Sequence, residues 1–223
     1  MYIKLWVLLC TGFLINCLAD VQWTYETFTN RLQAAKDGNA IAQTFIGLVY
    51  SSGAPEQGIE QDYAKAVKWL AKGANAGIPH AQFGLATCYQ LGNGVKQDYQ
   101  EALKWHIKAA DQGHTDGMYY AGSFYYLGYG CESNLTTAIK YLDRAASSND
   151  VDSLTLLGLI YYEKGDYPGD FERAKKYLKK AIELGDDDAK QHLAEVEQTE
   201  ALIQYTIDYQ KDMIESINET LKE

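Results

Sequence analysis

The fold is decided by a nine-residue stretch, AQFGLATCY at residues 81–89, which returns along the chain in altered form. An earlier copy reads AQTFIGLVY at 42–50, and later copies read GMYYAGSFY at 117–125 and SLTLLGLIY at 153–161. A degenerate copy, AKQHLAEVE, occupies 189–197, and successive copies begin 39, 36, 36 and 36 residues apart. Self-similarity at such a period is the sequence signature of a repeat protein.

A second block follows each of the first four copies. It reads QDYAKAVKW at 61–69 and QDYQEALKW at 97–105, and its main positions return at 134–146 and 170–181. This block keeps a spacing of 36 residues throughout, so the three extra residues of the first copy fall in the turn at 52–60. The apolar positions of both blocks have helical spacing, so each repeat is predicted to be a helix–turn–helix pair.

Certain residue types recur at fixed places because a helix pair needs them there. A small residue in the first helix lets the second helix approach closely; these are Gly47, Ala86, Gly122 and Gly158. A short polar residue before the second helix caps its free N–H groups; these are Asp62, Asp98, Asn134 and Asp170. A residue that tolerates the left-handed conformation ends the second helix; these are Gly77, Gly113, Asn149 and Gly185.

These residues, in this register, resemble the Sel-one-like repeat family, the short relatives of tetratricopeptide repeats. The resemblance covers four full copies, at about 39–77, 78–113, 114–149 and 150–185. It implies an all-α fold, a right-handed α/α superhelical solenoid in which neighbouring pairs stack to bury their apolar faces. It also implies a role in protein–protein contacts, without naming the partner.

Both ends of the repeat array are predicted to be caps. Residues 20–38 resemble an unpaired second helix, and residues 186–223 begin as a half-repeat and continue as a C-terminal capping helix. Apolar residues at roughly helical spacing should cover the last repeat; these are Leu202, Tyr205, Tyr209, Met213, Ile217 and Leu221. The alternative is that this last helix binds a partner or a second copy of the chain.

Residues 1–19 are predicted to be a signal peptide. Lys4 precedes an apolar stretch that ends near Ile15, and small residues up to Ala19 suit cleavage after that position. A lipoprotein signal centred on Cys17 and a buried N-terminal helix are the alternatives. The sequence therefore predicts an exported protein, in the periplasm, with an outer-membrane lipoprotein or a secreted protein as the other locations.

The charge of the chain argues against nucleic acid as a partner. The formal net charge is −10, and removal of Lys4 with the signal peptide makes it one unit more negative. Such a surface repels phosphate backbones and anionic lipid, and it favours a basic partner.

Two cysteines, Cys88 and Cys131, follow the signal peptide. An oxidising compartment permits a disulfide between them, since they lie in neighbouring repeats. Because they occupy different repeat positions, the alternative is a buried apolar Cys88 and an unrelated loop thiol at Cys131.

No catalytic or metal-binding motif appears in the sequence. It has no HExxH, no phosphate-binding Gly-Lys-Ser/Thr loop and no Cys/His cluster with metal-ligand spacing. Some members of the family that the sequence resembles have been discussed as β-lactamase-like, but the Ser-x-x-Lys motif of those enzymes is absent here. We therefore expect a non-enzymatic protein with no metal, cofactor or small-molecule substrate, monomeric when free.

The candidate binding site is the concave groove of the solenoid, which the first helix of each pair lines in tetratricopeptide-like folds. Four positions per repeat should face it, and they comprise His80, Phe83, Thr87, Gln90, Asp116, Tyr119, Ser123, Tyr126, Asp152, Thr155, Leu159, Tyr162, Asp188 and Gln191, with Glu195 from the degenerate copy. The aspartates form a row that could bind Lys or Arg, although the helix macrodipole alone favours acids in a first turn. The tyrosines are favoured anchors at interfaces, although they could instead pack against neighbouring helices.

Together these features predict an adaptor of the bacterial envelope that grips one partner protein in its groove. A narrower alternative is a periplasmic immunity protein that neutralises a toxic secreted effector, such as a phospholipase. A third hypothesis, from a different class, is an enzyme that acts on cell-wall material or β-lactams. A fourth is an endoplasmic-reticulum adaptor of a eukaryote.

Overall fold

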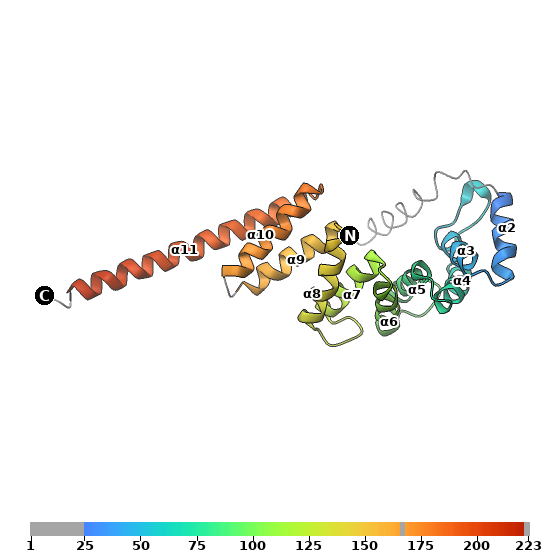
Figure 1. Cartoon of the computed structure of the whole chain (residues 1–223), viewed down its shortest axis with the longest axis horizontal. Coiled ribbons are helices and arrows are strands. Elements are labelled where there is room, and N and C mark those ends of the chain that lie inside the picture. The colour runs from blue at the N-terminus through green and yellow to red at the C-terminus, as the bar shows by residue number, and fades with distance from the viewer. Residues whose placement is uncertain (1–24, 166–167, 221–223) are drawn as a thin grey trace. The chain divides into compact units, whose positions relative to one another are not determined.

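The computed structural model describes residues 25–165 and 168–220, and the predicted signal peptide lies outside these residues. The described chain is helical, with one isolated bridge between Ala54 and Ile59 and no strand in the described ranges. It divides into two compact units: unit 1 ends at Asn134 and unit 2 begins at Leu135. Figure 1 shows the helices in chain order.

Unit 1 is built from six α-helices and one short 3-10 helix among its described residues. These are α2 (Tyr25–Lys36), α3 (Ala40–Ser52), η1 (Pro55–Gln57), α4 (Tyr63–Asn75), α5 (Pro79–Leu91), α6 (Tyr99–Asp111) and α7 (Thr115–Leu127). Unit 2 contains α8 (Leu135–Ser147), α9 (Val151–Lys164), α10 (Pro168–Glu183) and α11 (Asp188–Thr220). Within the units α3 packs on α4, α5 on α6, and α9 on α10, which confirms the predicted helix pairs.

The predicted caps account for most of the helix ends. Asp62 accepts a hydrogen bond from Lys65 N (2.9 Å), and Asp98 accepts from Gln100 N and Glu101 N (3.0 Å each), so both start a second helix. The predicted left-handed residues all have positive φ, with 87° at Gly77, 89° at Gly113, 61° at Asn149 and 100° at Gly185.

One predicted cap is wrong. Asp170 lies inside the first turn of α10, which begins at Pro168, instead of preceding the helix. Its side chain is buried and forms ion pairs with Lys164 (3.7 Å) and Arg173 (3.6 Å). A proline fits the first position of a helix, and this one starts α10 three residues earlier than the 36-residue spacing of α4, α6 and α8 would place it.

The small residues of the first helices lie where the second helices come closest, as predicted. A Cβ added at Gly47 would lie 2.7 Å from Leu70 Cγ of α4, and one added at Gly158 would lie 2.6 Å from Leu178 Cγ of α10. Both distances are shorter than any ordinary van der Waals contact, so the helix pairs depend on these glycines.

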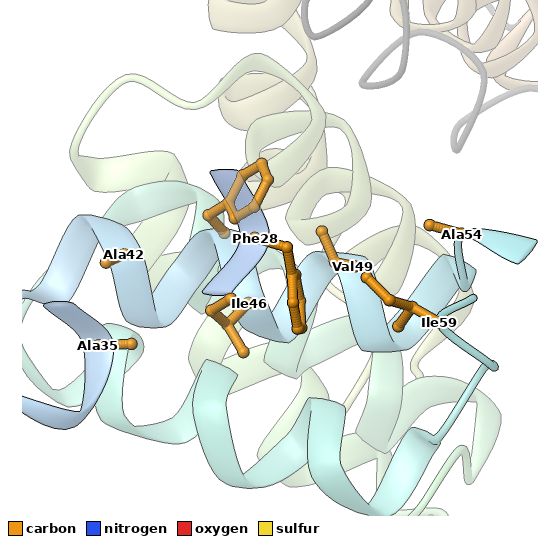
Figure 2. Close-up of a cluster of buried hydrophobic side chains, with 8 residues drawn as sticks. Phe28, Ala35, Ala42, Ile46, Val49, Ala54 and Ile59 are labelled. Carbon is orange, nitrogen blue, oxygen red and sulfur yellow. The ribbon is translucent and has the colours of Figure 1, made fainter. Parts of the chain in front are cut away.

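The first repeat is covered at its open end by α2. Phe28 of α2 is 5% exposed and lies in one cluster with Ile46 and Val49 of α3 and Ile59 of the following turn. Figure 2 shows Phe28 beside these α3 side chains. Tyr50 completes the contact, with its ring 6.0 Å from that of Phe28 in an edge-on arrangement.

The last helix covers unit 2 over only part of its length. The start of α11 packs on α10, with Ala189 and Val196 both fully buried, and Lys175 of α10 binds Glu200 at 2.7 Å. Beyond this point every residue from 201 to 218 is exposed. Here α11 continues past the N-terminal end of α10 (Figure 1).

The prediction that the apolar residues of this tail cover the last repeat is therefore wrong for the side chains that the structure describes. Exposed fractions are 64% for Leu202, 68% for Tyr205, 60% for Tyr209, 49% for Met213 and 51% for Ile217. Leu221 lies outside the described residues. The physical reason is length: α11 has 33 residues and α10 only 16, so the second half of α11 has no helix of unit 2 beside it.

Candidate protein-binding surface

The predicted groove residues of unit 1 lie on α5 and α7, and most of them reach solvent. His80 and Asp116 are exposed, and five others are half-buried: Thr87, Gln90, Tyr119, Ser123 and Tyr126. Two of the hydroxyls are used within their own helices, since Thr87 donates to Phe83 O (3.0 Å) and Ser123 donates to Tyr119 O (2.9 Å). The surface that remains for a partner is therefore mainly aromatic and acidic.

Phe83 differs from its neighbours because it is only 7% exposed. Its ring stacks on His114 (centroids 4.9 Å apart) and contacts Tyr120 (5.7 Å) and His106 (5.5 Å). Phe83 therefore holds α5 against α6 and α7 inside unit 1, and its ring is not presented to a partner.

His106 is the buried residue that the sequence reasoning missed. It comes from α6, it is fully buried, and its ring stacks on Tyr120 with centroids 5.0 Å apart. Its Nε2 lies 3.2 Å from Gln90 Oε1, and because that oxygen can only accept, Nε2 carries the proton of the neutral ring. Burial, and then the nearby His114, lowers the pKa of His106 to about 3.

His114 links this buried group to the surface. Its Nδ1 accepts a hydrogen bond from Gly117 N (3.2 Å), so the neutral ring caps α7, and its other face meets His80 (ring centroids 4.8 Å apart). Burial, and then His80, lowers the pKa of His114 to about 4. The capping role could have been found in the sequence, because Asn39, His114 and Asp150 occupy one repeat position and each caps a first helix.

Unit 2 places the remaining predicted residues on α9 and at the start of α11. Tyr162 OH lies 3.0 Å from Thr199 Oγ1 of α11, and Thr155 donates to Asp186 Oδ2 (2.5 Å) in the turn before α11. These contacts tie α9 to α11, so Tyr162 is partly a structural residue. Asp188 and Gln191 are exposed, and Asp152 and Leu159 are half-buried.

Unit 2 also contains a pocket that the sequence did not predict. It has a volume of about 560 Å3 and lies between α8 and α10, the second helices of their repeats. Its apolar lining includes Ala146 and Leu154, and its basic lining consists of Lys176, Lys179 and Lys180. Tyr177 OH donates to Asp143 Oδ1 across it (2.7 Å), and burial followed by this hydrogen bond raises the pKa of Tyr177.

The comparison with protein families matches what the helix pairs and their caps show. The family model described as "Sel1 repeat" matches residues 40–78, 79–114, 115–150 and 151–186. The chain belongs to the Sel1 repeat family. Each matched repeat begins one residue after the start predicted from the sequence. Repeats of this family generally serve as scaffolds for protein–protein interaction.

Two solved structures place the chain among Sel1-like proteins. One is c5321, a protective antigen of uropathogenic Escherichia coli strains displaying an SLR fold, with 35% identity, a TM-score of 0.69 and coverage of 74% of this chain. The chain spans only 35% of that structure's length. The other is a Sel1 repeat protein from Oxalobacter formigenes, with 30% identity, a TM-score of 0.66 and coverage of 77% of this chain and 69% of that one. A comparison with curated proteins finds no match.

Within the Sel1 repeats the two described cysteines are both free thiols. Cys88 is buried in one hydrophobic cluster and Cys131 packs against another, where its Sγ lies 4.0 Å from Phe124 O. The predicted disulfide is thus not formed, and the alternative of two unrelated thiols describes the structure. Burial raises the pKa of Cys88 to about 11, so it is a poor nucleophile.

Among the described residues, no group of three or more His, Cys, Asp or Glu side chains lies close enough together to hold a metal ion. None of the helices in the described ranges is long and apolar enough to cross a membrane.

Proposed function

We propose that this chain is a non-enzymatic scaffold of the bacterial envelope that binds a partner protein through the first helices of its Sel1 repeats. The supporting observation is the α7 face of unit 1, where Tyr119 and Tyr126 keep part of their rings exposed on a rigid helix beside the exposed carboxylate of Asp116. Tyrosine side chains bury a large area and lose little rotamer freedom, so they are favoured anchors of an interface. The chemistry fits a segment that carries Lys or Arg next to an apolar residue.

The test is capture of the partner from an envelope extract of the native host. Tyr119→Ala and Tyr126→Ala should each weaken binding by about 1–4 kcal/mol, the usual cost of truncating an aromatic anchor. Tyr25→Ala is the matched control, because Tyr25 is 59% exposed on α2, away from α5 and α7. If folded Tyr119 and Tyr126 variants bind normally and the Lys176→Ala, Lys180→Ala double variant of the α8–α10 pocket does not, the partner binds the second helices instead.

The envelope location rests on the predicted signal peptide, and the similarity to a protein described as a protective antigen supports it. Cell fractionation should find the chain with a periplasmic marker, and its N-terminus should read Asp20. Incorporation of labelled palmitate that Cys17→Ser abolishes would support the lipoprotein alternative. Recovery of the full-length chain in the cytoplasm would contradict both.

A narrower form of the proposal is that the partner is a toxic secreted effector, such as a phospholipase, which the chain neutralises in the periplasm. The acidic charge of the chain, −10, suits a basic target surface. Immunity predicts an effector gene beside this one and rescue of effector-poisoned cells by the wild-type chain. Turnover of β-lactams or cell-wall fragments by the purified protein would instead support the enzymatic alternative.

A further inference from the structure

The second half of α11 carries most of the large exposed apolar side chains among the described residues. We call residues 201–218 the α11 extension. It carries eight large apolar side chains that are 42–68% exposed: Leu202, Ile203, Tyr205, Ile207, Tyr209, Met213, Ile214 and Ile217. We propose that this extension is a dimerisation helix, covered by the same helix of a second copy of the chain in a parallel two-stranded coiled coil.

A helix of this composition needs a partner to be stable in water. The extension contains Ile203, Ile207, Ile214 and Ile217, and β-branched residues are only moderate helix formers. Most helical stability in proteins comes from an apolar face that packs against something, and the extension has no such packing against unit 2. No residue of unit 2 packs against it within the described ranges, and a second copy of the chain can supply the covering surface.

The spacing of the isoleucines is that of a coiled coil. Ile203, Ile207, Gln210, Ile214 and Ile217 follow one another at intervals of four, three, four and three residues. This is the alternation of the a and d positions of a heptad, and it places all five side chains on one face of the helix. We call this face the isoleucine seam. Tyr205, which is 68% exposed, lies on the opposite face.

The charges of the extension favour a second copy as the occupant. Its acidic residues Asp208, Asp212 and Glu215 lie away from the isoleucine seam. The positions that flank the seam carry Gln204, Thr206, Lys211, Met213 and Asn218, so no carboxylate would face its equivalent in a parallel pair. An anionic membrane is a poorer occupant. If the apolar face bound to it, the acidic side chains would lie in its negative surface potential and would be repelled.

The available area is sufficient for a specific contact. Burial of the isoleucine seam and its flanking side chains would remove on the order of 600 Å2 from each chain, or about 1,200 Å2 in total, which is the lower end of specific interfaces. Gln210 favours a parallel orientation of the two helices. In a parallel, in-register pair it meets Gln210 of the other copy, and the two side-chain amides can form hydrogen bonds with each other. The sequence alone predicted a free monomer, and the proposed dimer differs from that expectation.

The experiment is light scattering coupled to size exclusion on the purified full chain at micromolar concentration. The wild type should have twice the molar mass of one chain. Ile207→Glu and Ile214→Glu should each return the chain to a monomer, whereas Tyr205→Glu, with the same change of charge on the same helix, should leave the dimer intact. Circular dichroism should show that unit 2 stays folded in all three variants.

Three outcomes would overturn the inference. These are a monomeric wild type, a dimer that both glutamate variants of the seam preserve, and a dimer that Tyr205→Glu breaks as readily as Ile214→Glu. The direction has its own test: Gln210→Cys should form an interchain disulfide under mild oxidation, and Asp208→Cys, on the outer face, should not. A dimer that Gln210→Cys fails to cross-link would contradict the parallel register.

Discussion

Gly158 shows how a single residue sets the distance between the two helices of a repeat. An alanine there would place its Cβ 2.6 Å from Leu178 Cγ, and Leu178 is itself fully buried, so the leucine has no room to move. We expect Gly158→Ala to lower the free energy of unfolding by about 1–3 kcal/mol, the usual cost of overpacking a core. The measurement is urea denaturation followed by circular dichroism.

The matched control lies on the partner helix. A Cβ added at Gly169 of α10 meets nothing within 4 Å, so Gly169→Ala should be neutral or stabilise by about 0.5–1 kcal/mol through helix propensity. If Gly158→Ala proves as harmless as Gly169→Ala, the helices of this repeat do not depend on a close approach at Gly158.

His114 makes stability depend on pH. The folded protein lowers the pKa of His114 from its ordinary 6.5 to about 4, so the folded state resists a proton that the unfolded chain accepts below pH 6.5. The contribution of the neutral His114 to stability is therefore fully present above pH 6.5 and is lost as the pH falls towards 4. This loss amounts to up to about 3 kcal/mol, at 1.4 kcal/mol per pKa unit. Melting temperatures at pH 7 and pH 4.5 test this expectation.

A substitution separates His114 from the other groups that titrate in acid, which are the carboxylates and the buried His106. His114→Asn keeps a capping acceptor, as Asn39 provides at the same position of the first repeat, and removes the titration. This variant should lose less stability between pH 7 and 4.5 than the wild type. Equal pH dependence in wild type and His114→Asn would show that burial of His114 is not the cause.

At the scale of one element, α11 is a single helix whose first part packs on α10 and whose second part is exposed. Val196 is fully buried and Leu202, six residues later, is 64% exposed. Val196→Ala should cost about 2 kcal/mol of unfolding free energy, since it opens a cavity against α10, and Leu202→Ala should cost almost nothing. Thermal denaturation of both variants is the measurement; a large loss for Leu202→Ala would mean that the extension does cover unit 2.

At the scale of the whole molecule, the net charge of −10 should govern the rate at which a basic partner arrives. We expect the association rate constant to fall as salt rises from about 0.01 to 0.15 M, because the Debye length shrinks from about 30 to 8 Å. Asp116→Asn should reduce both the rate and its salt dependence more than Asp208→Asn, which removes the same charge from α11. Surface plasmon resonance over this range is the measurement, and equal effects of the two variants would place the binding face elsewhere.

What the sequence determined by itself is local. Helix periodicity, the small residue inside each pair, the caps at Asp62 and Asp98 and the left-handed residue at Asn149 all act within a few residues of chain, and the structure confirms each of them. The repeat register also predicted which helices carry the candidate binding residues. The exception is Asp170, which lies inside α10 because the helix starts earlier, at Pro168.

Only the tertiary structure decided which faces are covered. Phe83 and Tyr119 occupy the same repeat position, yet one is buried by His106 and His114 and the other reaches solvent. The pocket between α8 and α10 forms only because these two helices lie side by side. The α11 extension is exposed because α10 is shorter than α11. The physical reason is that periodicity specifies an apolar stripe, while the burial of that stripe depends on how far the neighbouring helix extends and which side chains it brings.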